Sequence, residues 1–294
     1  MLNCWYCEFT TFLISFYCKN TEIPFGIFYF CAMSPKRRQQ AFWQRKAFRW
    51  SVYAGLTVAF LAGGWYFYFG NFNQWTHSFK AGIRLPMRYE IHGIDVSKFQ
   101  GEINWRKMQQ MELPDQTQIS FVFVKATEGA TLIDKRFQQN FKAAKQVGLW
   151  RGAYHFYIPW RDPEKQANSF VRNVSLQKGD LPPILDIEVN SLKSDRDIIR
   201  DISTWLRLVE NHYGKKPIIY TNEHFYRKFV KGNFDEYPLW IADYSSENLT
   251  EYPARTLFFW QHSKDGWVEG IKGRVDFNVC LKSKAEVEEI CIEK

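Results

Sequence analysis

Eight short apolar runs follow one another between residues 91 and 280, and they constrain the fold more than any other feature of this chain. Each run is rich in β-branched and aromatic residues, as buried β-strands are. Helical patterns separate the early runs, and such alternation is typical of an α/β protein with a parallel sheet. The predicted strands are 91–99, 119–127, 152–158, 182–189, 216–222, 237–244, 256–263 and 274–280.

The predicted helices, the number of strands and the absence of nucleotide-binding motifs indicate how this sheet is arranged. Asp162 and Asp195 are suitable N-caps for the last two helices, and Gly214 is a suitable C-cap. Eight strands favour closure into a barrel in which the helices after residue 220 are reduced or missing. An open, doubly wound sheet is the alternative, but no G-x-G-x-x-G or P-loop motif supports nucleotide chemistry. The predicted helices are 103–111, 134–148, 162–174 and 195–214.

The segment LPPILDIEVN (181–190) places two carboxylates in an apolar strand. Side chains two residues apart in a strand point the same way, so Asp186 and Glu188 share a face. Burying unpaired carboxylates is costly, which favours a chemical use for them. In α/β barrels the active site lies at the C-terminal ends of the strands. Further acids occur near predicted strand ends, namely Asp95, Asp243 and Asp276.

Aromatic residues occur at similar depths in the same strands. Their pattern fits either a core or a set of platforms for stacking on sugar rings. No Ser-His or Cys-His pair is evident, and His92 and His155 are too scattered for a metal site, so we expect them in the core or behind the site. Acids and aromatics without a nucleophile–base pair are typical of glycoside cleavage, and no metal or cofactor is predicted. The aromatic residues are Tyr154, Phe156, Tyr220, Trp240, Tyr244 and Trp260.

The predicted strands carry a series of motifs in a fixed order. These are HGIDVSKFQGEINW (92–105), FVFVKATEG (121–129), GAYHFY (152–157), LDIE (185–188), IYTN (219–222), LWIADY (239–244), WQ (260–261) and VDFN (275–278). Together they resemble the glycoside hydrolase family 25 lysozymes, which cleave the β-1,4 bond between N-acetylmuramic acid and N-acetylglucosamine in peptidoglycan. The resemblance covers residues 91–282 and implies an irregular TIM-like barrel of eight strands and about five helices.

The resemblance also implies roles for individual residues. Glu188 matches the general acid, and Asp186 matches the acid that assists the acetamido group of the substrate. Asp95 and Asp276 match two further acids of the cleft. Burial should raise the pKa of Glu188, because a general acid has to hold its proton near neutral pH. The residues expected to bind the substrate are Tyr154, Phe156, Tyr220, Trp240, Asp243, Tyr244 and Gln261.

Two alternative functions fit a barrel of this kind. A chitinase-like barrel carries a D-x-x-D-x-D-x-E pattern, but Leu181 and Ile184 occupy the positions of two of its acids. A peptidoglycan-binding tether that no longer cleaves its ligand is the other alternative. The presence of all four acids favours catalysis over a tether, since a binding protein does not need them.

The residues outside the barrel divide into segments. Residues 1–32 are interpreted as an extension that the mature protein lacks, and 33–50 as a basic cytoplasmic segment. Residues 51–70 have no charge and predict a transmembrane helix. The basic residues before it predict a single-pass protein of the bacterial cytoplasmic membrane, with its N-terminus inside and its barrel on the wall-facing side. Residues 71–90 are predicted to be a stalk, and 283–294 a C-terminal tail.

The net charge of +8 is local to the N-terminal part of the chain. Residues 1–50 hold seven Lys and Arg against two Asp and Glu, so the rest is nearly balanced. This distribution does not favour a nucleic-acid partner. The predicted partners are peptidoglycan glycan strands and, through residues 51–70, the membrane. Cys280 and Cys291 could form a disulfide outside the cytoplasm.

Overall fold

The computed structural model describes residues 35–72, 75–245 and 248–293. The chain divides into two compact units, residues 1–66 and 67–294. The interpretation of residues 1–32 as an extension lies outside the described residues. The second unit contains the predicted barrel.

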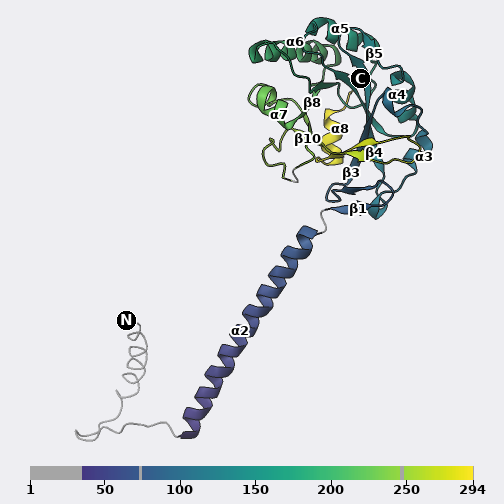
Figure 1. Cartoon of the computed structure of the whole chain (residues 1–294). Helices are drawn as coiled ribbons and strands as arrows, with labels where there is room; N and C mark the ends of the chain where they lie inside the picture. The colour runs from purple at the N-terminus through teal and green to yellow at the C-terminus, as the bar shows by residue number, and fades with distance from the viewer. Residues whose placement is uncertain (1–34, 73–74, 246–247, 294) are drawn as a thin grey trace. The chain divides into compact units, whose positions relative to one another are not determined.

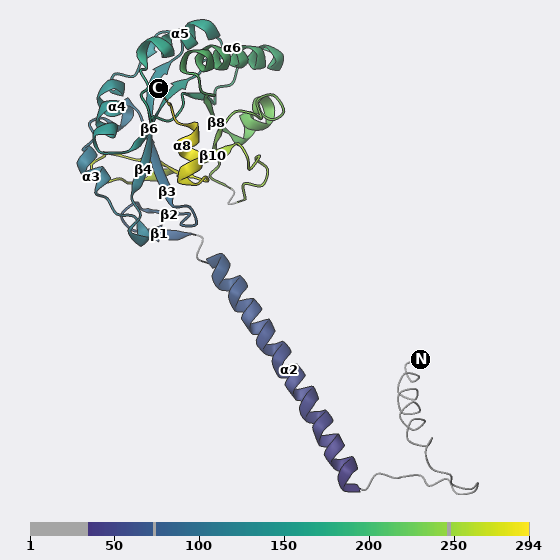
Figure 2. The same cartoon turned by 180° about the vertical axis from the view of Figure 1, so that it is seen from behind.

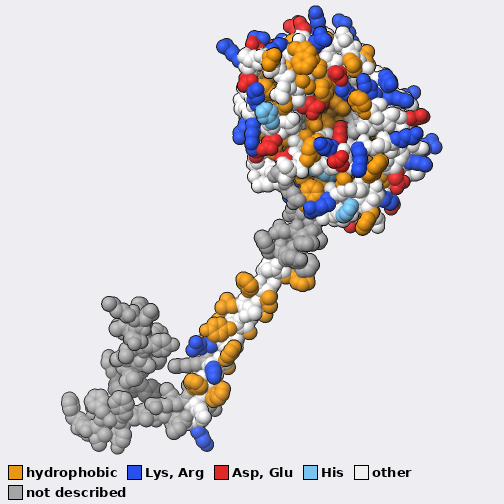
Figure 3. Space-filling model, viewed as in Figure 1, with side chains coloured by type: hydrophobic (Ala, Val, Ile, Leu, Met, Phe, Trp, Pro, Cys, Tyr) orange, Lys and Arg blue, Asp and Glu red, His pale blue; other side chains and the backbone are white. Residues whose placement is uncertain are grey.

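Helix α2 (Pro35–Phe72) contains the apolar segment 51–70, which is therefore helical as expected. Its described apolar side chains are exposed along the helix (Figure 3). Phe42, Trp50 and Phe60 are among them. Within the three described ranges, no helix is both long enough and apolar enough to cross a membrane. The predicted transmembrane span is therefore not confirmed.

All eight predicted strands are present and form a closed barrel (Figures 1 and 2). Pairing between the first and second barrel strands closes the ring, which excludes the open doubly wound sheet. A short extra strand, β5 (Leu132–Ile133), pairs with β4 at the edge. The barrel strands are β3 (Ile91–Val96), β4 (Ile119–Glu128), β6 (Trp150–Phe156), β7 (Ile184–Ile187), β8 (Ile218–Asn222), β9 (Leu239–Ala242), β10 (Leu257–Gly266) and β11 (Val275–Cys280).

The last strand corrects the expectation of a parallel sheet. Strand β11 runs antiparallel to both of its neighbours, β10 and β3, whereas the other adjacent barrel strands are parallel. Residues 267–274 join β10 to β11, and eight residues are too few for the crossover that a parallel neighbour needs. The N-terminal end of β11 therefore lies beside the C-terminal ends of the other strands.

The predicted helices are present and lie around the outside of the strands (Figure 1). Asp162 caps α5 as predicted, but Ser194 rather than Asp195 caps α6, and Gly214 ends α6 in the left-handed conformation. Shorter helical segments follow later in the chain, in agreement with the reduced connections expected there. The helices of the barrel unit are α3 (Trp105–Gln109), α4 (Phe137–Gln146), α5 (Pro163–Asn173), α6 (Asp195–Tyr213), α7 (Glu223–Phe225), a π-helical turn (Tyr226–Val230) and α8 (Lys284–Ile290).

The segment 71–90, predicted to be a stalk, contains regular structure in its described part. Strands β1 (Thr76–Ser78) and β2 (Ile83–Leu85) form an antiparallel hairpin. Trp75 packs edge-on against Trp260 of β10, and the backbone amide of Trp267 donates to the carbonyl of Ala81 over 2.8 Å. These contacts join residues nearly 190 positions apart, so no local period reveals them.

The predicted C-terminal tail is also structured. Ser283 and Glu286 form a capping box that begins α8, and this S-x-x-E pattern is readable in the sequence. Val287, Cys291 and Ile292 are buried against the barrel. Helix α8 follows the C-terminal end of β11, so it lies at the end of the barrel opposite the mouth.

Aromatic rings fill the interior of the barrel. The rings of Phe121 and Phe123 pack against Phe259, with centroids 5.2 and 5.0 Å apart, and Phe123 also packs against Trp240. Gly93 of β3 makes room for this layer, because a Cβ atom there would lie 2.5 Å from the ring of Phe121. The glycine of the HGID motif is thus explained by packing in the barrel.

Replacing Gly93 with alanine is expected to destabilise the barrel by about 2 kcal/mol, since overpacking a close-packed core typically costs 1–3 kcal/mol. For a domain of this size, thermal denaturation should show a Tm lower by about 4–8 °C. Combining the change with Phe121→Leu should restore part of the loss by freeing the space. A single variant as stable as the wild type would contradict this account of Gly93.

Candidate active site

A cleft of about 340 Å³ opens at the mouth of the barrel. Ten of the eleven residues that the sequence predicted for the site line it. Five further lining residues that carry polar, charged or aromatic side chains were not predicted: Ser97, Phe99, Gln100, Lys125 and Lys264. The ten predicted residues are Asp95, Tyr154, Phe156, Asp186, Glu188, Tyr220, Trp240, Tyr244, Gln261 and Asp276.

The alternation of strand β7 places the central acids. Asp186 lies within the strand and is buried, while Glu188 follows its last residue and is exposed at the mouth. In the sheet register, Asp186 lies between Phe156 of β6 and Tyr220 of β8. The two carboxyl groups therefore share a face of the strand but lie at different depths.

The pKa values of these two acids are raised, as the sequence analysis predicted for Glu188. Burial raises the pKa of Asp186 well above its usual range, and the negative charge of Glu188 adds to this. Partial loss of hydration in the cleft raises the pKa of Glu188, and the charge of Asp276 adds to it. None of the described residues forms a hydrogen bond with the buried Oδ1 atom of Asp186.

Asp95 and Asp276 form the second acidic pair. They are direct partners across β3 and β11, so the antiparallel direction of β11 brings Asp276 to the mouth from the start of its strand. Burial raises the pKa of Asp95 well above its usual range, with the charge of Asp276 adding to it, and burial raises the pKa of Asp276 to about 6. The two acids therefore favour their protonated forms more than free aspartates do.

A hydrogen-bond network holds Asp95 in place. Its Oδ2 atom accepts bonds of 2.8 Å from the side-chain amides of Gln261 and Asn278. The hydroxyl of Tyr220 donates to Oε1 of Gln261 over 2.9 Å, and the hydroxyl of Tyr244 donates to the same atom. These bonds fix the orientation of the Gln261 amide. The network therefore suits Asp95 to positioning a bound substrate rather than to donating a proton.

Asn278 is a site residue that the sequence analysis missed. Its side-chain oxygen accepts a bond of 2.8 Å from Nε1 of Trp240, so it links the aromatic interior to Asp95. The residue is the last letter of the VDFN motif, and its position two residues after Asp276 was the available signal.

Some of the aromatic residues belong to the core and others lie where they could stack on a sugar, which are the two roles expected from the sequence. Trp240 is almost fully buried in the barrel interior, whereas Tyr244 is half exposed at the mouth. Trp260 lies on the outer side of the barrel, where it packs against Trp75 and Tyr89. Only part of the aromatic pattern can therefore meet a ligand.

Asp243 is the predicted site residue that is not among those lining the cleft. Its carboxylate accepts bonds from the backbone amide and hydroxyl of Ser245 and from the hydroxyl of Tyr252. Its position after β9 matches that of the other acids, but the chain turns there and the side chain stabilises the turn.

Lys125 is one of the five lining residues that were not predicted, although it belongs to the FVFVKATEG motif. It lines the cleft and is only 6% exposed. Its Nζ atom lies 2.8 Å from Oε2 of Glu128 and 4.3 Å from the centroid of the Phe156 ring. Its positive charge opposes the increase in the pKa of both Asp186 and Glu188.

Replacing Lys125 with methionine should move the alkaline limb of the pH–rate profile to higher pH. Without the nearby cation, Glu188 should keep its proton to higher pH. If Glu188 acts as a general acid, it is active only while it is protonated. The profile of kcat against pH measures this. The double variant Lys125→Met, Glu128→Gln should shift less, because the acidic charge that Lys125 neutralises is also removed. An unchanged limb in the single variant would rule out this influence.

His155, Cys280 and Cys291 are buried. His155 is buried, with its ring nitrogens 2.7 Å from Oγ1 of Thr127 and 3.2 Å from Oε1 of Gln166. Cys280 and Cys291 are both free, so the disulfide considered for them is not formed. Among the described residues, no group of three or more His, Cys, Asp or Glu could hold a metal ion.

An eight-stranded barrel with acids and aromatics at its mouth defines the class of this protein, which is a glycoside hydrolase. The pattern of Glycosyl hydrolases family 25 matches residues 94–271. The chain belongs to this family.

Relatives of known sequence and structure agree with this assignment. Lysozyme M1 of Streptomyces globisporus is 32% identical over 209 residues, covering 64% of this chain and 67% of that protein. The uncharacterized protein YegX of Escherichia coli strain K12 is 42% identical over 197 residues, covering 67% and 72%. The structure of a family 25 glycosyl hydrolase from Bacillus anthracis superposes with a TM-score of 0.63 at 31% identity, covering 69% of this chain and 94% of that one.

Proposed function

We propose that this enzyme is a muramidase, which hydrolyses the β-1,4 bond between N-acetylmuramic acid and N-acetylglucosamine in peptidoglycan. The observation that carries the proposal is the convergence of four carboxyl groups with raised pKa values in one cleft. The lysozymes among the relatives support the choice of substrate.

Glu188 is the proposed general acid. It lies at the open mouth, where a leaving oxygen can reach it, and its raised pKa keeps the proton available. Asp186 lies deeper on the same face with a free buried oxygen, and its proposed role is to orient the acetamido group of the substrate. Asp95 and Asp276 are proposed to bind substrate hydroxyls and to supply negative charge in the cleft.

Digestion of purified peptidoglycan by the full-length protein tests the proposal. After borohydride reduction, mass spectrometry should detect fragments that end in reduced muramic acid. Fragments that end in reduced glucosamine would mean that the other glycosidic bond is cleaved. Binding without release of fragments would identify the non-catalytic tether, which the complete set of acids makes the weaker candidate.

We also propose that the barrel acts on the outer side of the bacterial cytoplasmic membrane. Peptidoglycan lies there, and the basic residues of segment 33–50 favour a cytoplasmic position for that segment. Protease treatment of spheroplasts should degrade the barrel; protection from the protease would contradict this location.

A further inference from the structure

Large apolar side chains are exposed mainly around the mouth of the barrel. Eight such side chains are exposed in its described residues, and two of them, Phe79 and Trp267, lie in or against the hairpin β1–β2. The other six lie on segments that directly follow a parallel strand, which places them on the face of the active site. These six are Phe99, Leu132, Ile133, Trp160, Leu192 and Tyr244.

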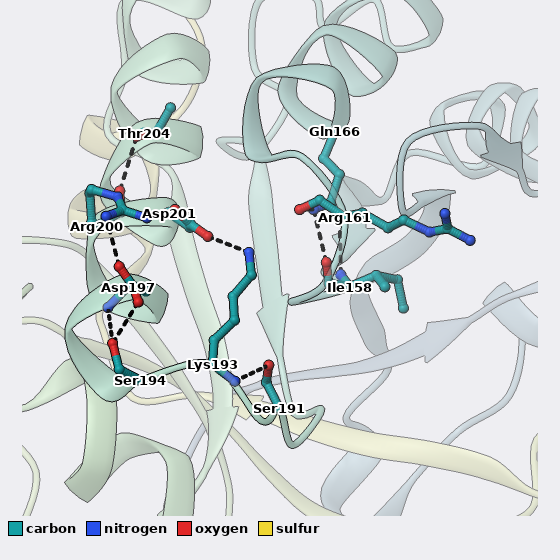
Figure 4. Close-up of polar contacts among 10 residues, drawn as sticks. All are labelled: Ile158, Arg161, Gln166, Ser191, Lys193, Ser194, Asp197, Arg200, Asp201 and Thr204. Carbon is teal, nitrogen blue, oxygen red and sulfur yellow. Dashed lines mark hydrogen bonds and ion pairs between the residues drawn. The ribbon is translucent and has the colours of Figure 1, made fainter.

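Trp160 is the largest of the six and lies on a firmly held loop. Gln166 of α5 is fully buried and bonds to the backbone of this loop (Figure 4). Its amide contacts the N–H and C=O of Ile158 over 2.9 and 3.0 Å and the C=O of Arg161 over 3.3 Å. The indole is nevertheless 58% exposed. A rigid loop thus presents an aromatic face to the solvent.

The neighbouring loop, between β7 and α6, is also bonded to a buried side chain of the helix that follows it. Asp201 of α6 is buried and accepts a bond of 2.7 Å from Nζ of Lys193 (Figure 4). The backbone of Lys193 donates to the hydroxyl of Ser191, and Leu192 between them is fully exposed. Since β6 and β7 are adjacent strands, this loop and the Trp160 loop leave the barrel side by side.

Both loops follow strands whose C-terminal residues line the cleft. Trp160 follows Phe156 by four residues and Leu192 follows Glu188 by four residues, and Phe156 and Glu188 both line the cleft. We propose that Trp160, with Leu192 beside it, is a platform that stacks on sugars of the same glycan strand beyond the cleaved bond. The substrate is then a long glycan strand rather than a short oligosaccharide. This inference rests on the proposed function.

The physical reason is that an exposed, preorganised indole binds a flat apolar sugar face with little loss of conformational entropy. The 340 Å³ cleft has room for only a short piece of a strand, so the binding of further sugars requires a surface outside it. The Trp160 platform supplies that surface next to Glu188.

Binding measurements in the Glu188→Gln background test the platform without hydrolysis. The ligands are long glycan strands freed of their peptides and the disaccharide of N-acetylglucosamine and N-acetylmuramic acid. Adding Trp160→Ala should raise the Kd for long strands about tenfold, as truncation of a binding aromatic does. The Kd for the disaccharide should change less than about twofold. Phe79→Ala, which truncates an exposed aromatic of the hairpin, should change neither value.

Three other binding results contradict the platform. Equal losses for both ligands would place Trp160 within the cleft or show damage to the fold. No loss for long strands, or no binding of them at all, would exclude the platform. If the wild-type protein does not cleave peptidoglycan but long strands bind through Trp160, the proposed muramidase activity fails and the glycan platform stands.

Discussion

Replacing Glu188 with glutamine is expected to lower kcat for peptidoglycan hydrolysis by about 10²- to 10⁴-fold, the contribution typical of general acid catalysis. Glutamine keeps the size and polarity of the side chain but has no acidic proton for the leaving oxygen. The cleft raises the pKa of the wild-type carboxyl group, which favours its protonated form. The initial rate of release of reducing ends measures the loss.

The matched control is Glu288→Gln on α8. Glu288 is exposed and contacts Lys284 only at 4.0 Å, so hydrolysis should remain at the wild-type rate. Binding of glycan strands to the Glu188→Gln variant should also persist, since the change removes a proton donor and not a surface. A variant that keeps more than a tenth of the wild-type kcat would show that another group donates the proton.

Replacing Asp186 with asparagine should separate activity from stability. If Asp186 orients the acetamido group, we expect kcat to fall by about 10²-fold, because the amide cannot supply the same negative charge to the reacting group. The stability of the folded protein should not decrease. Asp186 is buried with one oxygen unpartnered among the described residues, and a neutral amide of equal size avoids the cost of a buried charge.

The direction of the effect on stability follows from the pKa. Because burial raises the pKa of Asp186 in the folded state, the folded protein binds its proton more tightly than the unfolded chain does. This carboxyl group therefore lowers the stability as the pH rises from its ordinary pKa through the raised one. At neutral pH, Asp186→Asn should have a Tm equal to or above that of the wild type. A lower Tm together with lost activity would show that Asp186 is needed for folding.

The candidate site was largely predictable because its strands carry local signals. The period of two puts Asp186 and Glu188 on one face, and the apolar run around them indicates burial, so their position at the mouth follows from the strand alone. Asp243 carried the same signal but is not among the residues that line the cleft. The bonds from Ser245 and Tyr252 that hold it depend on a loop conformation with no period.

The hydrogen-bond network around Asp95 could not be predicted from local sequence patterns. Gln261 and Asn278 donate to the same oxygen of Asp95 from positions 166 and 183 residues away along the chain. Lys125 was similarly missed, because a lysine inside a strand is ordinarily taken as exposed. Its burial depends on Glu128 and on the ring of Phe156.

The sequence by itself determined the eight strands, the helices between the early ones and the acids at the mouth, because each depends on residues within a few positions of one another. Only the tertiary structure decided the reversed direction of β11, the hairpin of residues 76–85, the burial of Lys125 and the pairing of Asp95 with Asp276 across β3 and β11. These features depend on closure of the barrel, which brings distant residues into contact and removes them from water. Hydrogen-bond partners and pKa values are set by that contact and that loss of hydration.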